Sequence, residues 1–200
     1  MSVRGAASAR RPPGRPQSPA STRALMRATL AVVAERGYHD ATLHEIVARA
    51  GSSKPTVYRR WPSKPRLVAD AVRDALAAAN PSLPAGDDPR RDLAAVVRNV
   101  IHALATTPLA RVLAAVLGVA EREPALAAAL LDVERERRRL LRRAVARVGA
   151  RDPDLDVDVI LGALYFRVLM RRRRVPPRFA TELVRRLYPS GAGRGRRGAP

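Results

Sequence analysis

The tripeptide Ser-Lys-Pro occurs twice in this sequence, ten residues apart, at 53–55 and 63–65. Its lysines, Lys54 and Lys64, are the only two in a chain whose other strongly basic side chains are all arginines. Serine often caps a helix, and proline fits the first turn because the N–H that it lacks has no partner there. Each tripeptide therefore predicts the start of a helix, with serine as the cap and lysine at the first position.

These two lysines could bind phosphate. A cation at a helix N-terminus opposes the helix dipole, by about 0.3–1 kcal/mol at an exposed site. The same helix end attracts phosphate through its free N–H groups. Both lysines could also be ordinary solvated side chains placed there by chance. The neighbouring Tyr58, Arg59 and Arg60 favour contact with nucleic acid.

The segments before these starts are predicted to be helical as well. A first helix, 22–36, has apolar residues at spacings of three and four and stops at Gly37. A second begins after Thr42, which stands three residues before Glu45 as in a capping box, and ends at Gly51. Two short helices joined by a tight turn are typical of the helix-turn-helix motif.

The second helix of this motif would lie at 54–60, between the two Ser-Lys-Pro starts. In a helix-turn-helix, this helix presents its N-terminal residues to the DNA major groove. A longer helix is predicted to start after Ser63 and to reach the turn at Asn80-Pro81.

The rest of the chain is also predicted to be helical. A capping residue stands directly before a proline at Asp88-Pro89, Thr107-Pro108 and Asp152-Pro153. The predicted ranges are about 88–106, 108–122, 124–148, 152–174 and 176–188. In the 152–174 helix, Asp154 and Asp156 in the first turn and arginines at 171–174 in the last would complement the helix dipole.

Composition supports an all-α fold and a polyanionic partner. Hydrophobic residues make up 46% of the 200 residues and aromatic residues only 4%, which favours closely packed helices over sheets. The formal net charge of +20 indicates nucleic acid as the first candidate partner. A genome-wide preference for arginine codons would also raise the charge.

Other classes of protein find little support. The chain has no cysteine, which excludes disulfides and thiolate metal sites. It has neither an apolar run of membrane-spanning length nor the apolar stretch of a signal peptide, so we expect a cytoplasmic protein with no membrane partner. His39, His44 and His102 show no metal-ligand spacing, and there is no Gly-rich phosphate loop or nucleophile elbow. We therefore expect no catalytic residues, no metal and no cofactor.

Between Arg23 and Leu67 the sequence contains an ordered set of matches to a known family. They are Glu35-Arg36-Gly37-Tyr38, Thr42, Ile46, Ala50-Gly51, Ser53, Thr56-Val57-Tyr58, Ser63-Lys64 and Leu67. With these residues the segment resembles the DNA-binding domain of the TetR family of transcriptional regulators. Residues 164–167 resemble, more loosely, the C-terminal domain of one TetR subgroup.

The resemblance implies a homodimer of all-helical subunits, each with a DNA-binding and a C-terminal domain, and the composition of the two ends of the chain adds an arm and a tail. A basic arm at 1–21, expected to be disordered, precedes a helix-turn-helix domain at 22–68. A helical effector-binding and dimerisation domain at 69–188 is followed by a disordered tail at 189–200. The function implied is that of a ligand-responsive regulator, expected to be a repressor, that binds a palindromic double-stranded DNA operator. A protein that packages DNA without sequence choice is the alternative.

The resemblance also assigns DNA contacts to particular residues. Contacts to phosphate are implied for Thr42, Tyr58 and Lys64. Contacts to bases are implied for Lys54, Pro55, Thr56 and Arg59, with Ser52 beside them and Ser53 as the cap of the recognition helix. The arginine-rich stretch 135–143 is interpreted as a solvated face rather than a second DNA site.

Two further sites are implied for the C-terminal domain. An unknown small-molecule effector would contact His102, Leu104, Leu113, Leu117, Tyr165 and Phe166, although plain core packing would explain each of these residues as well. The dimer interface would contain Leu155, Val159, Gly162, Leu169, Leu183 and Leu187. In that interface Gly162 would allow a second backbone to approach closely, in a four-helix bundle across a twofold axis.

Overall fold

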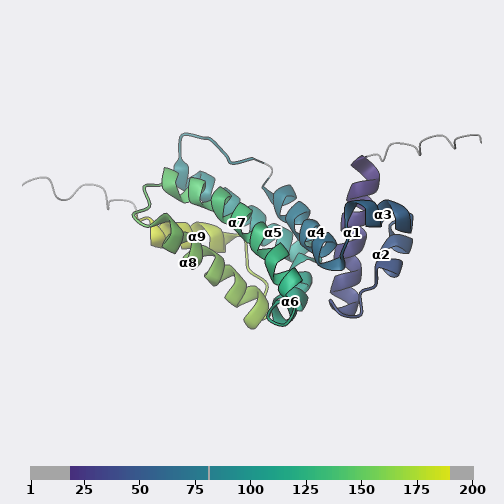
Figure 1. Cartoon of the computed structure of the whole chain (residues 1–200). Helices are drawn as coiled ribbons and strands as arrows, with labels where there is room; N and C mark the ends of the chain where they lie inside the picture. Colours follow the sequence, from purple (N-terminus) through teal and green to yellow (C-terminus); the bar gives the residue numbers. More distant parts are fainter. Residues whose placement is uncertain (1–18, 81, 190–200) are drawn as a thin grey trace, which may run out of the picture.

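The computed structural model of the chain describes residues 19–80 and 82–189, within which all regular structure is helical (Figure 1). The elements are α1 Pro19–Arg36, α2 Leu43–Arg49, α3 Lys54–Arg60, α4 Lys64–Ala79, α5 Pro89–Thr106, α6 Leu109–Ala120, α7 Pro124–Arg147, α8 Pro153–Tyr165, a π-helical turn η1 Phe166–Met170, and α9 Arg178–Leu187. The prediction of an all-α fold is confirmed. Because α1 begins at Pro19, the predicted arm overlaps this helix by three residues, and the rest of the arm and most of the tail lie outside the described residues.

The first three helices pack around a small apolar core. Val32 of α1, Ile46 of α2 and Val57 of α3 are completely buried. The chain turns sharply after α1 and after α2 at glycines with positive φ, Gly37 at +83° and Gly51 at +60°, a conformation that other residues rarely adopt. The helix-turn-helix that the sequence predicts is therefore present, with α3 as its second helix.

Lys54 and Lys64 occupy the first positions of α3 and α4, and Ser53 and Ser63 occupy the N-cap positions, as predicted, but neither serine forms a side-chain capping hydrogen bond. The Ser53 hydroxyl donates instead to the Thr56 hydroxyl at 2.8 Å, and Ser63 makes no capping hydrogen bond. A cap accepts from the second or third N–H of the helix. Proline at the second position removes one of these two donors, which weakens the capping role of the serine.

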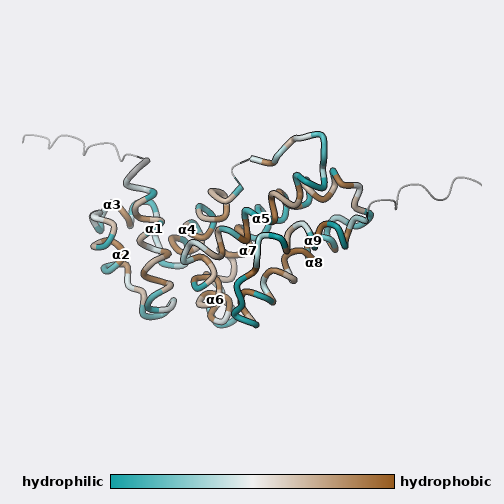
Figure 2. The backbone as a smooth tube through the Cα atoms, turned by 180° about the vertical axis from the view of Figure 1, so that it is seen from behind, coloured by the Kyte–Doolittle hydropathy of each residue, from teal (hydrophilic) through white to brown (hydrophobic). Residues whose placement is uncertain are grey.

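Long helices connect this N-terminal unit to the rest of the molecule. Helix α4 packs against α1 on one side and against α7 on the other, and α9 packs along α5. Figure 1 shows α1, α2 and α3 at one end of the molecule and α8 and α9 toward the other. Hydrophobic residues (brown) recur along the helices, with hydrophilic residues (teal) between them (Figure 2).

Three predicted helix starts are found close to the expected positions. Asp88 accepts hydrogen bonds from the N–H groups of Arg90 and Arg91, and Asp152 accepts from Asp154 and Leu155. Helix α6 begins at Leu109, and the backbone N–H of Leu109 donates to the Thr107 hydroxyl at 3.2 Å. The aspartate–proline and threonine–proline pairs therefore mark real helix boundaries.

The prediction of one continuous helix over 152–174 is wrong. Helix α8 ends at Tyr165, the chain widens into the π-helical turn, and Arg172 adopts a left-handed conformation with φ of 47°. The arginines at 171–174 are exposed and lie outside any helix, so they do not complement the dipole of α8. Pro176 and Pro177 favour extended backbone at the residues directly before them, so the chain does not run as one helix into α9.

Among the described residues, no single helix is long and apolar enough to cross a membrane. Helices α5 and α6 meet the criteria of length and composition only together, and they are bent by 86° at their junction.

Candidate nucleic-acid interface and apolar cavity

Helix α3 presents an outer face made of the residues that the sequence analysis assigned to DNA. Val57 is completely buried and fixes which side of this short helix faces the core. The assigned residues with exposed side chains are Thr42, Ser53, Lys54, Pro55, Tyr58 and Arg59. Ser52, Thr56 and Lys64 are half-buried. The fold thus brings the assigned residues to the end of the molecule that is formed by α1–α3.

The cations on this face differ in whether they form contacts within the protein. Lys54 and Arg59 form no hydrogen bond or ion pair with any residue in the described part of the chain. Arg60, by contrast, donates to the Thr22 hydroxyl at 2.9 Å and stacks over the Trp61 ring at 4.7 Å. Lys54 and Arg59 are therefore free to contact a polyanion, whereas Arg60 holds α3 to α1.

Thr42 caps α2 as the sequence predicts. Its side-chain oxygen accepts a hydrogen bond from the Glu45 N–H at 3.1 Å. Its side chain is exposed at the start of α2. Free N–H groups at such a helix end suit a phosphate oxygen.

Lys64 is part of the protein's own hydrogen-bond network. Its Nζ donates to the backbone carbonyls of Tyr38 at 2.8 Å and His39 at 3.1 Å, and it lies 4.5 Å from the centre of the Tyr38 ring. Burial lowers the pKa of this ammonium, against the opposing charges of Glu123 and Asp40. A cation at a helix start is unfavourable in an isolated helix. Here the two carbonyls and the ring stabilise it.

We therefore expect Lys64→Ala to destabilise the fold by about 1–2 kcal/mol, because it removes two hydrogen bonds from a charged donor. Lys54→Ala is the matched control and should leave the melting temperature unchanged or slightly higher, since Lys54 has no partner among the described residues and its charge opposes the helix dipole. Thermal unfolding of both variants tests this. Equal melting temperatures would show that the Lys64 contacts contribute nothing to stability.

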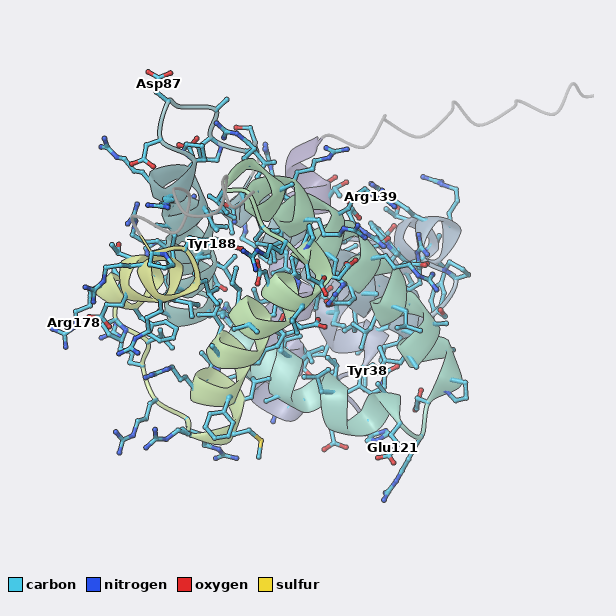
Figure 3. All side chains as sticks on the ribbon, turned by 90° about the vertical axis from the view of Figure 1, so that its left-hand side faces the viewer. Tyr38, Asp87, Glu121, Arg139, Arg178 and Tyr188 are labelled. Carbon is cyan, nitrogen blue, oxygen red and sulfur yellow. The ribbon has the colours of Figure 1, made fainter. Side chains whose placement is uncertain are left out.

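Polar contacts connect the helix-turn-helix to the C-terminal helices. The Tyr38 hydroxyl donates to Glu123 at 3.5 Å, and Figure 3 shows Tyr38 near the corner between α6 and α7. Burial, and then the charge of Glu123, raise the pKa of Tyr38 to about 12. His39 Nδ1 lies 3.9 Å from a Glu123 oxygen.

A second connection runs from the end of α3 through α4 to α7. Trp61 Nε1 donates to Asp70 at 2.9 Å, Asp70 pairs with Arg73, and Arg73 Nε donates to Glu136 at 2.9 Å. The sequence analysis did not find these residues, because their partners are distant in sequence and follow no motif. Through both connections, a movement of α6 or α7 would act on the helix-turn-helix.

An apolar cavity of about 490 Å³ lies among α4, α6, α7 and α8. Its lining includes Leu113, Leu117 and Tyr165, three of the predicted effector contacts. Leu104 lines a different hollow, and the side chains of His102 and Phe166 are exposed. The fold therefore does not gather the six predicted residues around one cavity, because α5 directs His102 outward and the turn after α8 directs Phe166 outward.

Arg137 lies between this cavity and a smaller one of about 220 Å³. Its side chain keeps only 8% of its accessible surface, and its guanidinium stacks on the Tyr165 ring at 4.9 Å. Burial lowers the pKa of this group, although Glu134 opposes the shift. Sequence reasoning treated the arginines at 135–143 as one solvated face, and Arg137 is an exception to that interpretation.

Helix α8 and the π-helical turn η1 together expose an apolar stripe, called here the α8 stripe and defined as Leu155, Val159, Gly162, Phe166 and Met170. Phe166 is 57% exposed and Met170 74% exposed, high values for such side chains. A Cβ added at Gly162 would meet no neighbouring atom outside the local helix backbone within 4 Å. The other predicted interface residues are less available, since Leu169 and Leu187 are half-buried and Leu183 is buried within the subunit.

The described residues contain no group of three or more His, Asp or Glu side chains that could hold a metal ion.

Two family models match most of the chain. Residues 25–71 match the model described as bacterial regulatory proteins of the tetR family. Residues 83–187 match the model described as a tetracyclin repressor-like C-terminal domain. The first match ends within α4, at residue 71, and the second begins shortly before α5, at residue 83.

Known proteins resemble either most of the chain or about a third of it. YdeS of Bacillus subtilis, an uncharacterized HTH-type transcriptional regulator, is 24% identical over 181 residues, which are 86% of this chain and 89% of YdeS. Mb2274c of Mycobacterium bovis, described in the same words, is 39% identical over 69 residues, which are 34% of this chain and 36% of that protein.

Solved structures have the same fold. The crystal structure of the TetR family transcription regulator SCO0332 superposes with a TM-score of 0.65 at 30% identity, over 84% of this chain and 96% of that one. The fatty acid degradation regulator FadR from Bacillus halodurans superposes with a TM-score of 0.67 over 84% of this chain and 97% of that one. At 20% identity, this second likeness concerns the fold alone.

Proposed function

Because the chain belongs to the TetR family of HTH-type transcriptional regulators, we propose that it is a homodimer that binds a palindromic DNA operator and releases it when a small molecule occupies the C-terminal domain. Residues 22–68 would bind DNA, and residues 69–188 would bind the effector and the second subunit. The observation that carries the proposal is the outer face of α3, where Lys54 and Arg59 lack any partner within the described chain.

On DNA, α3 would lie in the major groove with its N-terminal turn toward the bases. Lys54 and Arg59 would donate to base edges or phosphates, and Thr56 would contact a base. Thr42 and Tyr58 would fix the position of the domain through phosphate contacts. Lys64 would add one more phosphate contact only through the single N–H donor that its two bonds to carbonyls leave free.

The α8 stripe is the proposed centre of the dimer interface. Its large apolar side chains are exposed, and Gly162 lies between them with open space above its backbone. Such a patch on one helix face supports a contact with a second copy across a twofold axis. The dimer would hold two copies of α3 at a fixed separation, which a palindromic operator requires.

Effector binding would act through the two polar connections. The cavity is lined by residues of α6 and α7, and these helices reach the helix-turn-helix through Glu123 and Glu136. A ligand that moves either helix would change the separation of the two α3 helices. Because half-sites lie about 34–36 Å apart or a multiple of that distance, a shift of a few ångströms loses the register.

Selection of bound sequences from random duplex DNA tests the proposal. We expect an inverted repeat whose half-sites are spaced by about 10–10.5 base pairs or a multiple. Affinity for this repeat should exceed affinity for random duplex by roughly a thousandfold or more. Equal affinity for every duplex would instead favour a protein that packages DNA without sequence choice.

A further inference from the structure

The strongest unexplained feature of the C-terminal domain is the buried guanidinium of Arg137. It forms one hydrogen bond, from Nη2 to Glu134 at 2.5 Å. Its Nε is completely buried and has no acceptor. No other bond of this guanidinium to a described residue is formed. A guanidinium carries five N–H donors in a planar fork, so most of its donors lack a protein partner.

The surroundings of Arg137 are apolar on the side of the larger cavity. The lining includes Val72 and Leu76 of α4, Val116 and Leu117 of α6, and Leu130 and Leu131 of α7. Leu117 is 51% exposed and Leu131 53% exposed, so α6 and α7 each present a leucine to solvent beside the cavity. A volume of about 490 Å³ lies within the range of small-molecule sites, roughly 300–1,000 Å³.

We propose that this cavity binds an amphipathic organic anion, with its apolar body along the leucines and its carboxylate on the guanidinium of Arg137. A planar carboxylate matches the donor fork of arginine, and such charge-assisted pairs are stronger and more directional than neutral hydrogen bonds. Apart from the two glutamates and the hydroxyl of Tyr165, the remaining lining is apolar, so a ligand has few alternative polar contacts.

The acidic groups of the cavity do not favour a cationic ligand. Glu134 is already paired with Arg137. Glu121 is exposed at the end of α6, where water solvates its charge. An anion would complete the coordination of a buried cation, whereas a cation would have to compete with Arg137 for Glu134.

The position of Arg137 also connects the ligand to the DNA-binding end. Arg137 follows Glu136, which holds Arg73 of α4, and Arg73 pairs with the Asp70 that accepts from Trp61. An anion that draws the guanidinium into the cavity would act on this part of α7. This regulatory consequence rests on the proposed function, whereas the binding itself does not.

Titration calorimetry with three probes of equal chain length tests the proposal on the full-length protein. Dodecanoate, dodecanol and dodecyltrimethylammonium are added below the concentrations at which they form micelles. We expect dodecanoate to bind at least roughly tenfold more tightly than dodecanol, the size of one good charge-assisted pair, and the ammonium probe to bind most weakly.

Variants of Arg137 then locate the anchor. Arg137→Gln should lower the affinity for dodecanoate to that for dodecanol and leave dodecanol binding unchanged. Arg137→Lys keeps the charge but not the planar donor fork, so its affinity for dodecanoate should lie between those of the unaltered protein and of Arg137→Gln. Arg139→Gln is the matched control, because Arg139 is an exposed arginine of the same helix with no partner among the described residues (Figure 3).

Several outcomes would overturn the proposal. They are equal binding of dodecanol and dodecanoate, preference for the ammonium probe, unchanged dodecanoate binding in Arg137→Gln, or no binding of any probe. If Arg137→Gln does not fold, the proposal is tested by Arg137→Lys and by the comparison of the three probes on the unaltered protein. Operator binding is measured in parallel. Dodecanoate that binds through Arg137 without releasing DNA would leave the site standing and refute the effector role.

Discussion

Gly162→Arg should convert the protein from a dimer to a monomer without unfolding it. The glycine lies in the α8 stripe, its position is exposed, and a Cβ added there meets no neighbouring atom within 4 Å. The subunit therefore has room for an arginine. In a tight interface, however, the same arginine would bury a charge without a partner, which costs several kcal/mol. Sedimentation equilibrium should give the mass of one chain instead of two.

Loss of the dimer should also weaken operator binding steeply. In a dimer, the second helix-turn-helix binds as an intramolecular step, and this gain is about 10²–10⁴-fold. A monomer keeps only the affinity of one half-site. Gly118→Arg is the matched control, because Gly118 is an exposed helical glycine on α6 with no neighbouring atom within 4 Å. If the Gly162→Arg variant remains dimeric, α8 is not part of the dimer interface.

Lys54→Ala should relax sequence preference at one base position of each half-site. Lys54 stands at the first position of α3, its side chain is exposed, and it has no partner among the described residues. A lysine that donates to guanine is worth about 1–3 kcal/mol of discrimination, a factor of roughly 5 to 150. Operator variants with each base at each position should reveal one position at which the variant protein no longer discriminates.

The salt dependence separates this role from simple phosphate binding. Removal of a phosphate contact weakens all sequences alike and makes the dependence of affinity on salt shallower by roughly one unit. We expect Lys54→Ala to keep most of its affinity for random duplex. If it loses the same factor on operator and random duplex, Lys54 contacts phosphate, and recognition of bases must depend on Thr56 and Arg59.

The helix-turn-helix was predictable because its determinants are local. Glycines at 37 and 51 adopt the positive φ that ends their helices, and Thr42 caps α2 through a neighbour three residues away. The aspartates before Pro89 and Pro153 act in the same way within one turn of helix. Each of these effects acts over a few residues, so the order of residues along the chain is enough to show it.

The serines before α3 and α4, by contrast, show where local reasoning failed. The pattern of serine, lysine and proline predicted the two helix starts correctly but not the hydrogen bonds of the serines. The Ser53 hydroxyl has a second possible partner in Thr56, and the proline removes a donor that the cap would use. Local reasoning also missed the end of α8 at Tyr165. The apolar pattern in the sequence continues beyond this residue, although the backbone is no longer α-helical there.

Sequence alone therefore determined the family, the all-α class, and the residues on the outer face of α3. Only the tertiary structure decided which cations are free and which are used. Lys54 and Lys64 share the same local sequence, yet carbonyls 25 and 26 residues away hold Lys64. Arg137 and Arg139 stand on one helix, yet the packing of α4, α6 and α8 against α7 buries the first and leaves the second in water. Charge and spacing are properties of the chain, whereas burial depends on the distant segments that cover a side chain.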